Sequence, residues 1–235
     1  KTDKLFNYKR PMAEIIDGVG YLYVFPGKDY VRHYKKIYET CGYKVTAKTP
    51  TQAQTTRAIK NVLPDDMPTC DVALLGYVEA LAPGGQEWRG NDDVKWKTET
   101  INGQEVAFIG VAFSYWGNII YSVVEALSRY CSTVIYAGKL GSLAPSDTPN
   151  VTIATGDSSY VDGSLVTWNN LFKNSPLAVE GAHYTLPSVL DETAAWYNEV
   201  KDTYRFVDPE IGWAAKAAKD FSLSFSYLHL VTDNM

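Results

Sequence analysis

The stretch FVDPEIGWAAKAAKDFSLSFSYLHLVTDNM (residues 206–235) holds two strand patterns with a helix pattern between them. The short run YRFVD, ending at residue 208, predicts a strand, and Pro209 then opens a helix at a position where its missing N–H does no harm. A second apolar run predicts a strand that leads to Asp233. Ligands of α/β folds gather beyond the carboxyl ends of strands and at helix N-termini. Glu210 and Asp233 are therefore candidate site residues.

The same alternation of strands and helices runs through the rest of the chain. Further strands are predicted at 20–27, 43–49, 72–78, 132–143 and 151–163, and a hairpin at 94–113 whose turn is Asn102-Gly103. Further helices are predicted at 28–42, 51–63, 117–131 and 188–203, the last with Ser188 as N-cap. This order predicts an α/β fold in which helices cover a central mixed sheet.

Composition limits the kind of partner. The net charge of −5 and the pI near 5.2 argue against binding to nucleic acid, so small-molecule chemistry is expected. The three cysteines are scattered without metal-ligand spacing, which predicts neither disulfides nor a metal site and favours a cytoplasmic protein. No apolar run has the length of a membrane span, and no membrane contact is expected.

Residues 70–235 resemble the nucleoside phosphorylase and nucleosidase superfamily, whose members cleave the N-glycosidic bond of nucleosides. The segments DVALLGYVEAL, VKWKTETINGQEVAFIGVAF and VIYAGKLGSL are similar in order to its first strand, its hairpin and its strand with a glycine turn. FVDPEIGWAAKAA is similar to its Val-Glu-Met-Glu helix, and LHLVTDNM to its Ser-Asp strand. The resemblance implies a three-layer sandwich around a central mixed β-sheet, without a metal or organic cofactor.

The resemblance also implies roles for single residues. Asp233 is expected to protonate N7 of a departing purine, with its pKa raised by partial burial. Glu210 is expected to accept hydrogen bonds from the ribose hydroxyls as an ionised carboxylate. Tyr184 falls where the family stacks an aromatic ring on the base or sugar, although an ordinary half-buried tyrosine is an equal alternative. His183 is the histidine expected near a ligand.

The nucleophile decides between hydrolysis and phosphorolysis. Glu79 resembles the glutamate of the Gly-Ala-Met-Glu motif that helps to activate water, and Tyr136 occupies the position of the phosphorylases' arginine. Hydrolysis is therefore preferred. Lys139 could bind phosphate instead, which leaves a phosphorylase as the alternative. Ser114 is a further candidate donor, but the bulky residues around it replace the family's Gly-x-Gly, so a non-catalytic nucleoside-binding or storage protein also stays open.

Residues 1–69 precede the family-like part and are predicted to form an α/β extension packed on it. The extension could bind a partner, shape the pocket or enlarge the sheet. Relatives generally continue into a final helix beyond the position of Asp233, so the 70–235 core is expected to lack that helix. The expected partners are a nucleoside, phosphate in the alternative reaction, and further copies of the chain in a homo-oligomer, as in the family.

Overall fold

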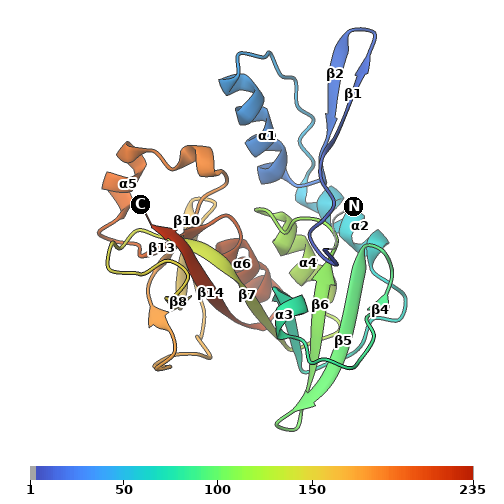
Figure 1. The fold of residues 1–235 in the computed structure, drawn as a ribbon, viewed down its shortest axis with the longest axis vertical. Coiled ribbons are helices and arrows are strands. Elements are labelled where there is room, and N and C mark those ends of the chain that lie inside the picture. The colour runs from blue at the N-terminus through green and yellow to red at the C-terminus, as the bar shows by residue number, and fades with distance from the viewer. Residues whose placement is uncertain (1–3, 235) are drawn as a thin grey trace.

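A computed structural model describes residues 4–234, which form a large mixed sheet with helices on both sides (Figure 1). The strands are β1 Met12–Ile16, β2 Val19–Tyr23, β3 Val72–Gly76, β4 Arg89–Gly90, β5 Val94–Ile101, β6 Gln104–Val111, β7 Thr133–Ser142, β8 Ile153–Thr155, β9 Ser158–Val161, β10 Ser164–Thr167, β11 Val179–Glu180, β12 His183–Thr185, β13 Phe206–Asp208 and β14 Ser224–Asn234. The helices are α1 Lys28–Thr40, α2 Gln52–Val62, α3 Val78–Leu81, α4 Ile119–Leu127, α5 Ala194–Val200 and α6 Ile211–Asp220, with a 3-10 turn, η1, at Val189–Asp191.

Alternating side chains of the sheet face two separate cores. In β3, Ala73 and Leu75 join the core that includes α2, α4 and α6, whereas Val72 packs with Val78 of α3 on the opposite face. At the other end of the sheet, Val207 of β13 packs on that opposite face with α5. Since successive residues of a strand point to opposite faces, the sheet is buried between two helical layers. The predicted three-layer α/β fold is confirmed.

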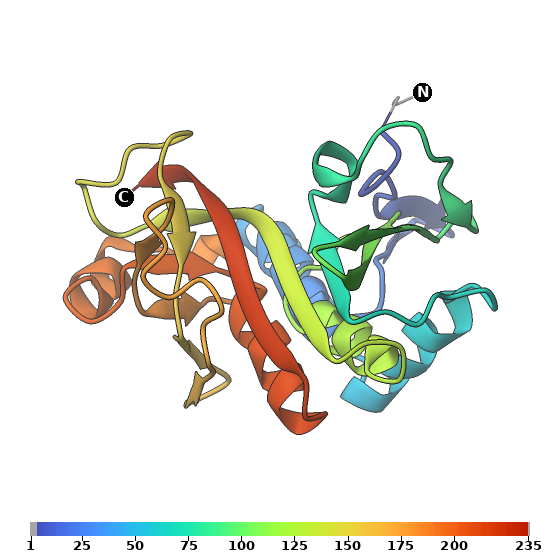
Figure 2. The ribbon, with the colours of Figure 1, turned by 90° about the horizontal axis from the view of Figure 1, so that it is seen from below.

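The long strand β7 organises the sheet. β14 runs parallel to it along one whole edge, and Figure 2 shows the two strands side by side. The other edge is shared by β3, which is parallel and ends with Gly76 opposite Ala137, and by β13, which is antiparallel and begins with Phe206 opposite Ser142. The carboxyl ends of β3 and β13 therefore point toward each other along residues 138–140 of β7. The chain leaves both strands beside this short stretch of β7, into α3 on one face of the sheet and into α6 on the other.

The first part of the chain does not enlarge the main sheet. β1 and β2 form a separate two-stranded hairpin that projects from the body (Figure 1). The helices predicted at 28–42 and 51–63 are present as α1 and α2, and the Thr51 side chain accepts a hydrogen bond from the Gln54 backbone N–H in a capping box. The prediction of a strand at 43–49 is wrong, because this segment has no regular secondary structure. β1 was not predicted.

Two other segments differ from the sequence pattern. The helix predicted at 188–203 is divided into η1 and α5, because the Ser188 and Thr193 side chains each cap the turn that follows them. The region after β8 holds more short strands than its polar, turn-rich sequence suggests. The hairpin at 94–113 is confirmed, with positive φ at Asn102 and Gly103. Within residues 4–234, none of the helices combines the length and apolarity that a membrane crossing requires.

Candidate functional site

Asp208 is a buried carboxylate at the point where β13 passes into α6. Its Oδ1 accepts hydrogen bonds from the backbone N–H groups of Glu210 and Ile211, both at 2.8 Å. The same oxygen lies 3.1 Å from Nε2 of His183, and Oδ2 lies 3.7 Å from Nε2 of His229. Burial alone would raise the pKa of Asp208, but His183, His229 and the backbone donors together lower it. Asp208 is thus an ionised group inside the protein.

Glu210 follows Asp208 at the N-terminus of α6. Burial and the neighbouring Asp208 carboxylate raise the pKa of Glu210 well above its ordinary value, while Lys139 acts in the opposite direction. Like charges at close range cannot both be ionised cheaply, so Asp208 keeps the charge and Glu210 keeps a proton. The expectation of an ionised Glu210 is therefore corrected. As a neutral acid it can still accept one hydrogen bond and donate another.

Asp233 lies near the end of β14 and is exposed. A bulge between Val231 and Asp233 shifts the register, so that Asp233 pairs with Gly141 of β7. A Cβ built on Gly141 would lie 3.1 Å from Oδ2 of Asp233 and 3.2 Å from Cγ1 of Val207, which puts the carboxyl on the face of the sheet that carries α5. The expectation that Asp233 is partly buried is wrong, because the bulge turns it to the surface.

Glu192 is a site candidate that the sequence pattern did not reveal. It follows η1, and its pKa is raised to about 7, first by burial and then by the charge of Asp233. The two carboxyl groups are therefore near enough to interact. A carboxyl that keeps its proton near neutral pH is suited to general acid chemistry. A glutamate in a polar segment carries no sequence signal for this property, which depends on the tertiary neighbours.

The remaining polar candidates are either exposed on the surface or engaged in a local hydrogen bond. Glu79 of α3 and Lys139 of β7 are exposed, and the charge of Lys139 acts on Glu210. Ser114 is partly buried, and its Oγ accepts a hydrogen bond from the Trp116 backbone N–H at 3.3 Å. The bulky residue before it, Phe113, stacks on Phe25 at 4.1 Å between ring centroids. Core packing with the N-terminal segment thus accounts for the loss of the glycine pattern.

Neither His183 nor Tyr184 points freely into solvent. His183 is fully buried, and its Nδ1 lies 2.9 Å from Oγ of Ser159. It contacts Asp208 and has no surface for a ligand, so the expectation that it binds substrate is corrected. Tyr184 alternates to the opposite face, where its ring packs against Trp196 and Tyr204. This is the ordinary half-buried tyrosine that the sequence left as an alternative.

His229 of β14 is the second histidine beside Asp208. It is fully buried, but neither of its ring nitrogens has a hydrogen-bond partner among residues 4–234. Burial lowers the pKa of His229 to about 4, against the attraction of Asp208. The ring is therefore neutral at pH 7. Its centroid lies 4.6 Å from the ring centroid of Tyr136.

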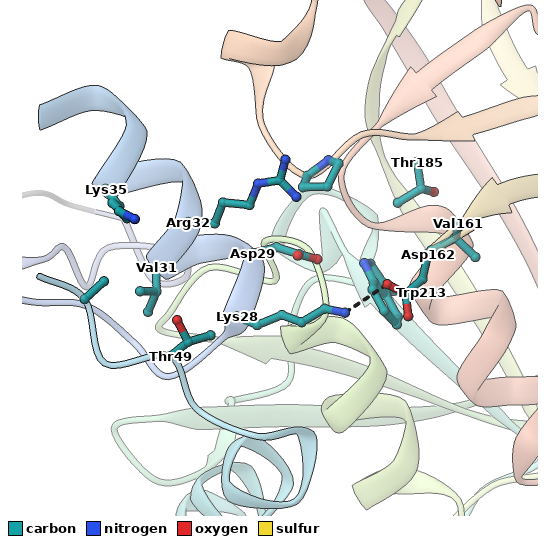
Figure 3. Close-up of a pocket in the computed structure, with 12 residues that line it drawn as sticks. Lys28, Asp29, Val31, Arg32, Lys35, Thr49, Val161, Asp162, Thr185 and Trp213 are labelled. Atoms are coloured by element: carbon teal, nitrogen blue, oxygen red, sulfur yellow. Dashed lines mark hydrogen bonds and ion pairs between the residues drawn. The ribbon is translucent and has the colours of Figure 1, made fainter. Parts of the chain in front are cut away.

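A cavity of about 460 Å³ lies elsewhere, between α1, α6 and the loop after β9 (Figure 3). Its lining includes Lys28, Arg32, Thr185 and Trp213. Glu79, Lys139, Glu210 and Asp233 are not part of that lining. No described group of histidine, cysteine and acidic side chains could hold a metal ion.

Solved structures share this fold at low sequence identity. The 5′-methylthioadenosine/S-adenosylhomocysteine nucleosidase of S. pneumoniae is 16% identical with a TM-score of 0.57, over 70% of this chain and 86% of that one. The H. pylori enzyme with 5′-methylthioadenosine in its active site is 12% identical with a TM-score of 0.55, over 70% and 85%. Futalosine hydrolase of H. pylori is 13% identical with a TM-score of 0.56, over 69% and 84%. The resemblance to the nucleoside phosphorylase and nucleosidase superfamily is thereby confirmed for the fold.

Sequence comparison adds one curated relative. Oxidoreductase cns1 of Cordyceps militaris is 24% identical over 92% of this chain. The chain spans about a third of that relative, 33% of its length. No protein-family model matches the chain.

Proposed function

We propose that the chain cleaves the N-glycosidic bond of a purine nucleoside or a related N-riboside, by hydrolysis in preference to phosphorolysis. The fold shared with nucleosidases supports the reaction class. The observation that carries the proposal is the meeting of chain segments beside residues 138–141 of β7. Glu79 follows β3, Glu210 follows β13 and Asp233 ends β14, and all three strands pair with β7.

The leaving base is protonated by the Asp233 and Glu192 pair in this mechanism. A purine anion leaves poorly, so a proton or strong hydrogen bond at N7 lets the bond to C1′ stretch toward an oxocarbenium-like transition state. Asp233 is exposed and free to reach a base at the end of the sheet. Glu192, with a pKa of about 7, supplies a proton close to it. The proton passes from Glu192 to Asp233 and from Asp233 to N7 of the base, so the mechanism needs both carboxyl groups.

Glu210 holds the ribose. Its protonated carboxyl accepts a hydrogen bond from one ribose hydroxyl and donates one to the other. Lys139 lies close enough for its charge to act on Glu210 and to bind an oxygen of the sugar or of a phosphate.

The nucleophile is water activated by Glu79. The exposed carboxylate of Glu79 stands just after Gly76, at the end of β3 that faces residues 138–140. The alternative, a phosphorylase, would use Lys139 to bind phosphate, but the arginine expected of such enzymes is replaced by the buried Tyr136. A binding or storage protein without turnover is the second alternative. For the hydrolase and for both alternatives, the proposal includes assembly of the chain into a homo-oligomer.

Incubation with purine nucleosides, with and without phosphate, distinguishes these functions when the free base is followed by chromatography. Base release without phosphate supports the hydrolase. Strict dependence on phosphate supports the phosphorylase, and saturable binding without release supports the binding protein. Neither release nor binding across adenosine, inosine, guanosine and 5′-methylthioadenosine would overturn the proposal.

Asp233→Asn is expected to lower the rate of base release by about 10²- to 10⁴-fold, the usual contribution of a general acid. Because Asp233 is exposed, the variant should unfold at the same temperature as the wild type. Asp65→Asn, which changes an exposed acid in a distant loop, is the matched control. Equal rates in Asp233→Asn and Asp65→Asn would remove Asp233 from the mechanism.

A further inference from the structure

The cavity of about 460 Å³ lies where the N-terminal segment meets the rest of the protein. One wall comes from α1 and residues 47–49, and the other from β9, β12 and α6 (Figure 3). Its size falls within the range of small-molecule sites, which often lie between two structural units. None of the residues assigned to nucleoside cleavage lines it. The cavity is therefore a candidate site separate from the one assigned to nucleoside cleavage.

Three cations of α1 share the side of the helix that faces this cavity. Lys28, Arg32 and Lys35 are spaced i, i+4 and i+7, and all three line the cavity. In Figure 3, Lys28 and Arg32 extend from α1 toward the opposite wall. Such a row places positive charges along one wall rather than scattering them.

The two acids of the lining are already engaged. Asp162 binds Lys28 with an Oδ1–Nζ distance of 3.0 Å, and Lys28 also lies 4.6 Å above the Trp213 ring. Asp29 is buried and accepts a hydrogen bond from the Asn118 backbone N–H at 3.2 Å, and burial raises its pKa. Neither acid neutralises the remaining cations.

Arg32 and Lys35 keep donors for a ligand. The Arg32 side chain is 62% exposed, and its guanidinium reaches a carboxylate, that of Asp191, only at 4.0 Å. The Arg32 side chain donates no hydrogen bond within residues 4–234, and Lys35 has an exposed helix pair with Glu39 at 3.5 Å. Exposed pairs of this kind contribute little and exchange readily for a better partner.

We propose that this cavity binds a phosphorylated small molecule, with its phosphoryl group on Arg32 and Lys35. A guanidinium and an ammonium on one helix face match a phosphoryl group, because Arg donates two parallel hydrogen bonds and Lys adds a point charge. The rest of the ligand lies along Val31, Thr49 and Pro187, where the lining is mixed apolar and hydroxyl. Trp213 and the Lys28–Asp162 pair close the far end.

Isothermal titration calorimetry of the full chain with ribose 5-phosphate, ribose and inorganic phosphate tests the site. Saturable binding of ribose 5-phosphate without binding of ribose is expected. Weaker binding of inorganic phosphate supports a contribution from the sugar, and equal binding supports a site for the phosphoryl group alone. No saturable binding of ribose 5-phosphate or phosphate at millimolar concentration overturns the proposal.

Arg32→Ala is expected to raise the Kd for ribose 5-phosphate about tenfold or more, the effect of removing a charge-assisted hydrogen bond. Lys35→Ala should weaken binding in the same direction. Arg57→Ala, an exposed arginine of α2 outside the lining, is the matched control and should bind as the wild type. Unchanged binding in both Arg32→Ala and Lys35→Ala would overturn the assignment.

This site is independent of nucleoside cleavage. Asp233→Asn should bind ribose 5-phosphate like the wild type, since Asp233 does not line the cavity. Arg32→Ala should in turn release base from nucleosides at the wild-type rate. Failure of either function is then distinguishable from failure of the other.

Discussion

At the scale of single residues, protonation is set by neighbours that lie far away in sequence. Asp208 stays ionised because backbone N–H groups and His183 surround it, and this charge keeps the proton on Glu210. Asp233 has the corresponding effect on Glu192. In each pair the charge of one acid therefore raises the pKa of the other, an arrangement that suits acid–base chemistry.

The pair of Glu192 and Asp233 can be tested without any assay of activity. Asp233→Asn removes a negative charge, so it should lower the pKa of Glu192 from about 7. Because burial is the larger cause, the value should remain above that of an exposed glutamate. Carbon-13 NMR titration of the glutamate carboxyl groups measures this shift. A Glu192 titration that is identical in wild type, Asp233→Asn and Asp65→Asn would show that the two groups do not interact.

At the scale of elements, the junction of β3 with β7 fixes where Glu79 emerges. Gly76 has φ +96°, and a Cβ at this position would lie 1.9 Å from the carbonyl oxygen of Ala137. Tyr77 then donates its backbone N–H to that same oxygen at 2.9 Å. Only glycine allows this approach, so the glycine that ends the apolar run also sets the position of α3.

Gly76→Ala should lower the free energy of unfolding by at least about 3 kcal/mol, since both a positive φ and a backbone clash oppose the methyl group. Gly20→Ala in β2, where nothing lies within 4 Å of the added Cβ, is the control and should change stability by less than about 0.5 kcal/mol. Urea unfolding followed by tryptophan fluorescence measures both. If the two variants are equally stable, β3 does not approach β7 this closely.

At the scale of the whole molecule, α1 is held on the body by aromatic and polar contacts. The His33 ring lies 4.5 Å from Trp116 between centroids, and its Nδ1 lies 2.8 Å from Oγ of Ser188. Lys36 forms an ion pair with Asp191 beside it. These contacts join the N-terminal segment to the loop around η1.

The attachment of α1 should weaken in acid. Burial lowers the pKa of His33, although Asp191 opposes the shift, so the folded state holds a neutral ring. At pH values between the lowered pKa of His33 in the folded state and its pKa of about 6.5 in the unfolded chain, the unfolded chain binds more protons. The neutral ring therefore stabilises the folded state above about pH 6.5, and this stabilisation is lost as the pH falls below that value.

Hydrogen exchange of residues 28–40, corrected for the intrinsic rate, should therefore be faster at pH 5.5 than at pH 7.5, whereas exchange of α6 should change little. His33→Gln can keep a hydrogen bond to Ser188 without titrating and should remove the difference. The same pH dependence in His33→Gln would assign the effect to a group other than His33.

The sequence determined the order of the main strands and helices from residue 72 onward. Apolar runs and turn residues such as Asn102-Gly103 act locally, and they predicted β3, the β5–β6 hairpin, β7, β13, α6 and β14. The order of these elements predicted an α/β fold, and the resemblance of their segments to the nucleosidase superfamily predicted the fold shared with nucleosidases. The strand predicted at 43–49 was wrong because its alternating pattern finds no partner edge.

The tertiary structure alone decided the state of the candidate site. The bulge after Val231 exposes Asp233, the Asp208 charge keeps Glu210 protonated, and His183 is buried against Asp208. The cavity between α1 and α6 joins residues from both ends of the chain. Exposure, pKa and cavity shape depend on which distant groups become neighbours, whereas strand and helix patterns depend on residues a few positions apart.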